Sequence, residues 1–355
     1  MAMRVAAFLI VPAVVAANLT AACGGSSPAA PETTPPTTTA TPAPVLIGMH
    51  MTASPMDVSK ITSISALGTM APWGHTLPTD HAYFYHHVGP GPVEPVQVFA
   101  PAAGRIKFAN NNRIDVDVDD EYSYWIGPVV LASGIASGVN VQAGTLLGMH
   151  ATGAPAFDFS VLRKTQRLNF INPARYSNET LWADGPMKYF EGSVKAQLDA
   201  KVLRTGNDLD GKIDYDVAGT LAGNWFAEDL PVSQSAIGGE QFYGTRKLSF
   251  ARDVYQPHLR RVSIGGLGLT GLYGVNDDSP EFASVTPASG LVVFRLLSPG
   301  APMSPPTDTQ AGWLLVQLID ATHLRVEAVP IAIALTFAAG PVPQMFTSGA
   351  QIYLR

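Results

Sequence analysis

Short apolar runs separated by turns are the feature that most constrains how this chain folds. Its 355 residues include 33 glycines and 29 prolines, and Val-, Ile- and Phe-rich stretches recur between them. Glycine and proline weaken helix interiors and are common in tight turns. The sequence therefore predicts a mainly β fold. After the first 44 residues, ~310 remain, which is enough chain for two domains.

The N-terminal segment predicts export. Arg4 is the only charged residue before an apolar run at 5–17. Such a run is typical of a signal peptide and is too short for a membrane-spanning helix. Cys23, the only cysteine, follows two alanines in a pattern that resembles a bacterial lipobox. We expect residues 1–22 to be a lipoprotein signal peptide and Cys23 to carry the lipid. The alternative is an ordinary secreted protein with an incidental cysteine.

The next segment predicts a tether. Residues 23–44 contain six prolines and six threonines and almost no large apolar side chain, so they cannot bury enough surface to fold. We expect an exported lipoprotein of the bacterial cell envelope, anchored in a membrane by its lipid. The net charge is −6 and no basic cluster is present, so nucleic acid is not an expected partner.

Residues 45–204 are predicted to form a first β-domain followed by one helix. Apolar and acidic residues alternate in 114–118, as in a half-buried strand. Pro186 precedes apolar residues at helical spacing, which predicts a helix over 186–203. The predicted strands of this domain are 81–86, 96–100, 104–109, 114–118, 144–150 and 156–162.

Residues 205–355 return to a strand pattern and are predicted to form a second β-domain, either a sandwich or a barrel. Gly223-Asn-Trp225 resembles the Gly-x-Trp opening of lipocalin-like barrels, which can hold one small ligand. The alternative is an aromatic core residue in a β-domain. The predicted strands are 212–216, 247–250, 260–264, 291–297, 313–319, 323–329, 331–337 and 351–354.

Three segments between residues 71 and 163 carry a family resemblance. They are Val98-Phe-Ala-Pro-Ala-Ala-Gly-Arg-Ile106, Val141-Gln-Ala-Gly-Thr-Leu-Leu-Gly148 and Ala156-Phe-Asp-Phe-Ser-Val161. In order and spacing they resemble the LytM/lysostaphin-type zinc metallopeptidases, which carry the duplicated hybrid motif and cut peptide cross-links in bacterial cell walls. The resemblance implies a LytM-like β-domain.

The resemblance also implies zinc as a cofactor. The family binds it through the histidine and aspartate of His-x-x-x-Asp and the second histidine of His-x-His; the first histidine of His-x-His helps catalysis. Here Ala156 stands at that catalytic histidine and Asp158 at the third ligand. His75 and Asp80 are five residues apart, one more than in the family, and His81 is the alternative for the aspartate's place. The expected zinc ligands are therefore His75, His81 and Asp158, with Asp80 as an alternate. The alternative is that these side chains are hydrogen-bonding partners, such as an Asp158–His81 pair.

Three hypotheses of function follow. In the first, the degenerate LytM-like domain is a non-catalytic cell-wall-binding or regulatory module, with peptidoglycan or an envelope protein as its partner. In the second, the chain is a zinc-dependent peptidase or hydrolase with rearranged ligands, and His86, His87 or His150 replaces the missing base. In the third, the C-terminal β-domain carries a small ligand. The first is favoured because an alanine at position 156 cannot transfer a proton.

Overall fold

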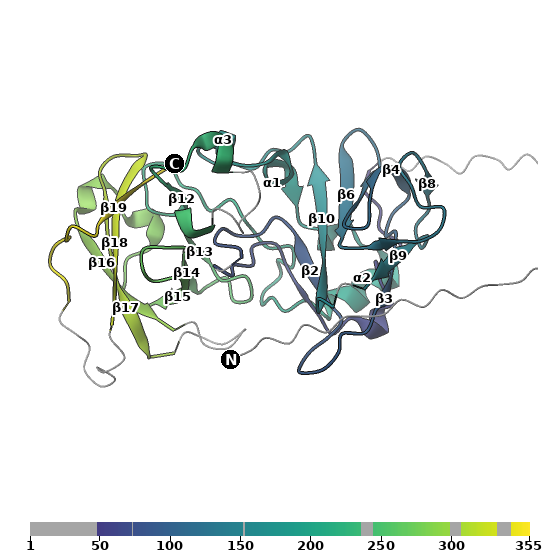
Figure 1. Cartoon of the computed structure of the whole chain (residues 1–355), viewed down its shortest axis with the longest axis horizontal. Helices are drawn as coiled ribbons and strands as arrows, with labels where there is room; N and C mark the ends of the chain where they lie inside the picture. The colour runs from purple at the N-terminus through teal and green to yellow at the C-terminus, as the bar shows by residue number, and fades with distance from the viewer. Residues whose placement is uncertain (1–47, 73, 152, 236–243, 299–306, 332–341) are drawn as a thin grey trace, which may run out of the picture. The chain divides into compact units, whose positions relative to one another are not determined.

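The structure is a computed structural model that describes residues 48–72, 74–151, 153–235, 244–298, 307–331 and 342–355 (Figure 1). Leu46–Arg355 form one compact unit. The expected signal peptide, Cys23 and the tether lie outside the described residues. The mainly β fold is confirmed, since most elements are antiparallel strands. Among the helices in the described ranges, none has the length and apolar character needed to cross a membrane.

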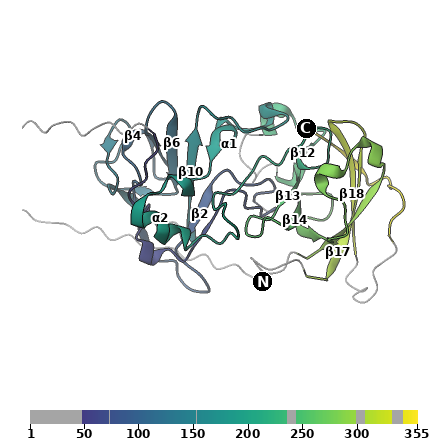
Figure 2. The same cartoon turned by 180° about the vertical axis from the view of Figure 1, so that it is seen from behind.

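The first part of the unit is built on an eight-stranded antiparallel sheet with the order β1-β2-β10-β6-β5-β4-β8, in which β11 also pairs with β10 (Figures 1 and 2). Three further strands form a separate sheet in the order β3-β9-β7. The bounds are β1 Ser63–Ser65, β2 Ala82–Tyr85, β3 Val96–Phe99, β4 Gly104–Ala109, β5 Ile114–Asp117, β6 Tyr122–Gly127, β7 Val130–Leu131, β8 Asn140–Val141, β9 Leu146–His150, β10 Ala156–Arg163 and β11 Ala183–Asp184.

Strand β10 shows how the sequence orients the large sheet. Phe157, Phe159 and Val161 alternate along it and are completely buried on the inner face. Phe157 stacks on Phe84 of β2 with ring centroids 5.5 Å apart. Burying each such side chain contributes about 1.5–3 kcal/mol. Because side chains alternate between faces, Asp158 is placed on the opposite, outer face.

Two glycines of the family-like segments are required by close packing. A Cβ on Gly104 would lie 2.6 Å from the carbonyl oxygen of Asp117, and one on Gly148 would lie 2.1 Å from that of Val130. Both distances are too short for any larger residue without backbone movement. These glycines therefore let neighbouring strands approach, which is a structural role independent of any catalytic activity.

The predicted helix over 186–203 is wrong in extent. The α-helix covers only Gly192–Asp199 (α2), after a 3-10 turn at Met187–Tyr189. Between them, Phe190 and the next residue are extended because Met51 pairs with this segment through backbone hydrogen bonds of 3.0 and 3.1 Å. Tertiary pairing thus overrides the helical period. Among the described residues, the other α-helices are α1 Asn178–Trp182 and α3 Val232–Ser235, and the other 3-10 turns are Val58–Lys60, Pro173–Arg175, Gly244–Arg246, Phe282–Ser284 and Pro287–Ser289.

The second part is a closed barrel of eight antiparallel strands, in which each strand pairs with the next and β12 pairs with β19. A barrel, and not a sandwich, is the form that the structure takes. Its interior is a packed core that includes Trp225, Phe250 and Phe294, all completely buried. The strands are β12 Gly223–Ala227, β13 Lys247–Arg252, β14 Arg260–Ile264, β15 Gly271–Val275, β16 Val292–Leu297, β17 Gln310–Leu318, β18 His323–Pro330 and β19 Gln351–Leu354.

The predicted strand at 212–216 is wrong, because this segment is held by side-chain-to-backbone bonds. The carboxylate of Asp216 accepts hydrogen bonds from the backbone N–H groups of Ile171 and Asn224, at 3.0 and 2.8 Å. Such bonds compete with a strand ladder. The predicted strand at 331–337 lies outside the described residues from position 332 onward.

Trp225 of the Gly-x-Trp segment helps to close the barrel. The guanidinium of Arg355 lies 4.0 Å from the Trp225 ring centroid and donates to the carbonyl oxygens of Val217, Leu221 and Ala222. Burial lowers the pKa of Arg355 to about 10, so it stays charged at neutral pH. The lipocalin-like resemblance and the domain boundary after residue 204 stay predictions.

Candidate functional site

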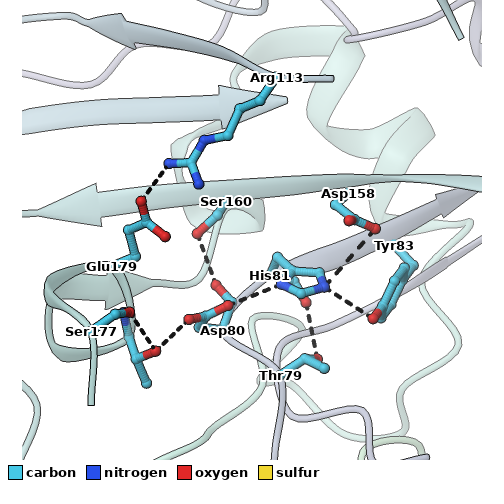
Figure 3. Close-up of polar contacts among 10 residues, drawn as sticks. Thr79, Asp80, His81, Tyr83, Arg113, Asp158, Ser160, Ser177 and Glu179 are labelled. Carbon is cyan, nitrogen blue, oxygen red and sulfur yellow. Dashed lines mark hydrogen bonds and ion pairs between the residues drawn. The ribbon is translucent and has the colours of Figure 1, made fainter. Parts of the chain in front are cut away.

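The outer face of the large sheet brings the expected site residues together. Asp158 of β10 lies opposite Tyr83 of β2, and Ala156 lies opposite Tyr85. His81 directly precedes β2 and points toward Asp158 and Tyr83 (Figure 3). The ring of His75, from the loop before β2, lies 5.7 Å from the His81 ring centroid.

Asp80 fixes the orientation of His81. One carboxylate oxygen of Asp80 lies 2.9 Å from His81 Nδ1, and the other accepts a 2.5 Å hydrogen bond from the hydroxyl of Thr180 in α1. Ser160 of β10 donates to the backbone carbonyl of Asp80 at 2.8 Å (Figure 3). Burial acts to raise the pKa of Asp80, but the hydrogen bond and charge of His81 and the Thr180 bond hold that pKa below its usual value. Asp80 is therefore ionised at neutral pH.

The second nitrogen of His81 is also engaged. Nε2 lies 3.0 Å from the hydroxyl of Tyr83 and 3.9 Å from the nearer carboxylate oxygen of Asp158. Burial acts to lower the pKa of His81, but the hydrogen bond and charge of Asp80, together with the charge of Asp158, raise it above the usual value. His75 behaves in the opposite way, since burial and repulsion by the neighbouring His81 lower its pKa to about 4 and leave it neutral at pH 7.

Asp158 is half-buried, and neighbouring groups only partly balance the negative charge of its carboxylate. Its separation from His81 is longer than a hydrogen bond, so the expected Asp158–His81 pair exists only as a charge interaction. Burial raises the pKa of Asp158, and the positive charge of His81 only partly opposes that increase. In the part of the chain that the structure describes, no group donates a hydrogen bond to this carboxylate.

The side chains do not fit a zinc site as they are arranged. Zinc ligands lie about 2.0–2.2 Å from the metal, which sets tetrahedral ligand separations near ~3.3 Å. The 3.9 Å from His81 to Asp158 is wider, and the Tyr83 hydroxyl occupies the same nitrogen. Within the described ranges, no group of three or more His, Cys, Asp or Glu side chains is arranged to hold a metal ion. Asp80 bonds His81 Nδ1, and its role as an alternate ligand stays a prediction. The assignment of His75, His81 and Asp158 to zinc stays a prediction.

Three further residues of the site were not anticipated from the sequence. Tyr83 is two positions after His81, so strand alternation could have placed it on the same face. Thr180 is 100 residues from Asp80, and no local pattern connects the two. The ring centroids of Trp125, in β6, and His81 are 5.5 Å apart. The guanidinium carbon of Arg113 lies over the Trp125 ring, 4.4 Å from its centroid.

A cavity of about 300 Å³ adjoins this network. It lies where the loop before β2, the segment that includes α1, and the first barrel strands meet. Polar and charged groups line much of it, so it suits a polar ligand. Its lining includes His75, Asp80, His81, Arg175, Asn224 and Lys247.

His150, one of the suggested replacements for the missing base, is held by the backbone. Its ring nitrogens lie 2.8 and 3.1 Å from the carbonyl oxygens of Pro128 and Ala154, and the residue is buried. His86 packs against it with ring centroids 5.1 Å apart. His87 bonds the carbonyl oxygen of Gly89 at 2.8 Å. None of the three is held against Asp158 by a hydrogen bond.

Comparisons with known proteins give only distant similarities. No family model matches the chain, and no curated protein matches it. The antimicrobial peptidase lysostaphin from Staphylococcus simulans is 14% identical over 85% of this chain and 92% of its own, with a TM-score of 0.26. The M23 metalloprotease pseudoalterin from the deep sea is 19% identical over 39% of this chain and 80% of its own, with a TM-score of 0.27. Csd3 from Helicobacter pylori is 16% identical over 34% of this chain, which spans 33% of the length of Csd3, with a TM-score of 0.26. Similarities this weak carry no argument about activity, zinc or substrate.

Proposed function

We propose that this protein is a membrane-anchored envelope lipoprotein whose LytM-like domain binds cell-wall peptide without cleaving it. The observation that carries the proposal is the position of Ala156, which shares the outer face of β10 with Asp158 and lies opposite Tyr85. A methyl group there cannot accept or donate a proton, so the family's catalytic step has no base at this position. The predicted lipid at Cys23 and the tether support the anchoring.

The engagement of His81 supports binding over hydrolysis. Both of its ring nitrogens have protein partners, Asp80 and Tyr83, so the imidazole is fixed within the sheet face. Rigid aromatic and polar side chains on regular strands form a preorganised surface, which favours ligand binding because little entropy is lost on association. The outer face of β2 and β10 is therefore suited to hold an extended peptide.

The test is co-sedimentation of the purified full chain with bacterial sacculi at physiological salt. We expect the protein to sediment with the sacculi, and we expect no new free amino groups in the supernatant. His81→Ala should weaken sedimentation. Asp117→Asn is the matched control, because Asp117 pairs with Lys164 away from His81, and it should sediment normally. Absence of sedimentation would contradict binding, and release of amino groups would contradict the lack of cleavage.

A further inference from the structure

The outer face of the barrel forms one wall of the cavity that adjoins the large sheet. Leu248 and Phe250 of β13 belong to the packed core of the barrel, so strand alternation places Lys247 on the outer face. Trp225 of β12 also faces inward, which places Asn224 on the outer face. Lys247 and Asn224 both line the cavity, and neither is more than 3% exposed. The barrel therefore contributes an ammonium group and an amide group to the cavity.

Arg175 brings a second basic group to the same cavity. It is the last residue of the 3-10 turn Pro173–Arg175, is 3% exposed and lines the cavity. Its guanidinium carbon lies 4.8 Å from the ring centroid of Phe226 in β12, and Nη1 donates to the carbonyl oxygen of Leu230 at 3.1 Å. Phe226 and Leu230 form one buried cluster with Leu77. These contacts hold the guanidinium in place against the barrel before any ligand arrives.

The two carboxylates of the cavity lining are bonded to other groups. Those of Asp80 lie 2.9 Å from His81 Nδ1 and 2.5 Å from the hydroxyl of Thr180. Glu179 accepts a 2.8 Å hydrogen bond from Arg113. An ammonium group has three N–H donors and a guanidinium group has five, so each basic group can bind an anion while it keeps its bonds to the protein. The lining therefore favours a ligand that carries a negative charge.

The cavity lies at the start of β2, because residues 77–81, directly before this strand, all line it. A peptide extended along the outer face of β2 and β10 reaches the cavity at this end. We propose that the cavity, which we call the carboxylate pocket, binds a carboxylate group of that peptide through Lys247 and Arg175. Hydrogen bonds from these two cationic groups to a carboxylate are of the strong, charge-assisted kind. This inference rests on the peptide-binding function proposed above and names the ligand group that the pocket takes.

The test is calorimetric titration of the full chain with three short peptides in EDTA-containing buffer. They are acetyl-Ala-Ala-Ala with a free C-terminus, acetyl-Ala-Ala-Ala-amide and acetyl-Ala-Glu-Ala-amide. We expect at least one of the two carboxylate-bearing peptides to bind about 10-fold more tightly than the neutral one. The peptide that binds tightly shows whether a chain end or a side chain supplies the carboxylate. Lys247→Met should abolish the preference. Lys164→Met is the matched control and should keep it, because Lys164 pairs with Asp117 and does not line the pocket.

Equal affinity for all three peptides would overturn the proposal, and this comparison needs no variant. A preference that survives both Lys247→Met and Arg175→Gln would overturn it as well, with circular dichroism melting to confirm that each variant folds. A preference that appears only without EDTA would also overturn it, because a metal ion would then hold the carboxylate. Sacculus binding without any carboxylate preference would leave the proposed function standing and remove only the carboxylate pocket; a carboxylate preference without sacculus binding would do the reverse.

Discussion

The barrel and the outer face of the large sheet differ in how they treat buried charge. In the barrel, Arg261 and Asp253 are both buried and joined at 2.6 Å, and the guanidinium of Arg260 donates to four backbone carbonyl oxygens. On the sheet, Asp158 is half-buried with no donor among the described residues. The charges of the barrel are bonded within the protein, whereas the carboxylate of Asp158 stays partly open to solvent. Five substitutions test this difference.

The largest effect is expected from Trp225→Ala in the barrel. The ring is completely buried and lies against Arg355, so its removal leaves a cavity and exposes a buried charge. We expect a loss of about 4 kcal/mol in the free energy of unfolding, measured by urea titration. Phe108→Ala, at a residue that is 45% exposed, is the control and should lose less than about 1 kcal/mol. Similar losses of unfolding free energy in both variants would show that the buried ring in the barrel contributes no more to stability than an exposed one.

Asp253→Asn is expected to cost about 2–3 kcal/mol, because it removes the charge that the buried Arg261 faces. Urea unfolding followed by circular dichroism measures the change. A loss below about 0.5 kcal/mol would mean that the barrel tolerates an uncompensated arginine, and the contrast with the sheet face would fail.

Asp80→Asn should lower the pKa of His81, because it removes the hydrogen bond and charge that raise that pKa. The raised folded-state pKa makes protonated His81 stabilising below its unfolded value of about 6.5, and this contribution disappears as pH rises through the folded value. The substitution should therefore lower the free energy of unfolding by about 1–2 kcal/mol at pH 5.5 and by less at pH 9. NMR titration of the His81 ring and urea unfolding at both pH values check this. An unchanged His81 pKa would show that Asp80 does not control the imidazole.

Tyr83→Phe frees His81 Nε2 from the hydroxyl at 3.0 Å. We expect a small stability loss of about 0.5–1 kcal/mol. We also expect more zinc per chain after dialysis against zinc and gel filtration, measured by atomic absorption, because an imidazole nitrogen becomes available beside Asp158. Zinc content equal to that of the unaltered chain would show that the hydroxyl does not keep metal from this nitrogen. His81→Ala is the control for zinc bound elsewhere.

Asp158→Asn is expected to have the smallest effect on stability, within about 0.5 kcal/mol, since no hydrogen bond to the carboxylate is lost. It is the matched partner of Asp253→Asn, with the same chemical change in the other region. Thermal and urea unfolding should show near-identical stability for Asp158→Asn and the unaltered chain. A loss as large as that of Asp253→Asn would show that Asp158 is structural.

Strands with one solvated face could be predicted from the sequence. The prediction for β4 matched its bounds because turns flank it, and β10 was found because Phe157 and Phe159 alternate with smaller or polar residues. Strands β6 and β12 were missed because apolar and polar residues do not alternate regularly along them. Burial alone is not the reason, since β14 is also buried along its whole length and was predicted.

The site could be predicted only in part. The order of the family-like segments was enough to place His81 and Asp158 near each other, because strand pairing follows that order. The detailed bonding could not be predicted, since the partner of Asp80 is Thr180 on a distant helix. The bond between His81 Nε2 and the Tyr83 hydroxyl, which keeps that nitrogen from a metal, depends on side-chain distances that a sequence does not contain.

The closure of the barrel has a consequence for how the protein is made. Arg355 bonds the carbonyl oxygen of Val217, 138 residues earlier in the chain, and β19 completes the ladder with β12. Contacts over such separations form slowly because a long loop must be closed before they contribute. A ribosome makes β12 long before β19, so the barrel keeps an open edge until β19 has been made. Until then, the edges of β12 and β18 that β19 covers stay unpaired and can pair with other chains.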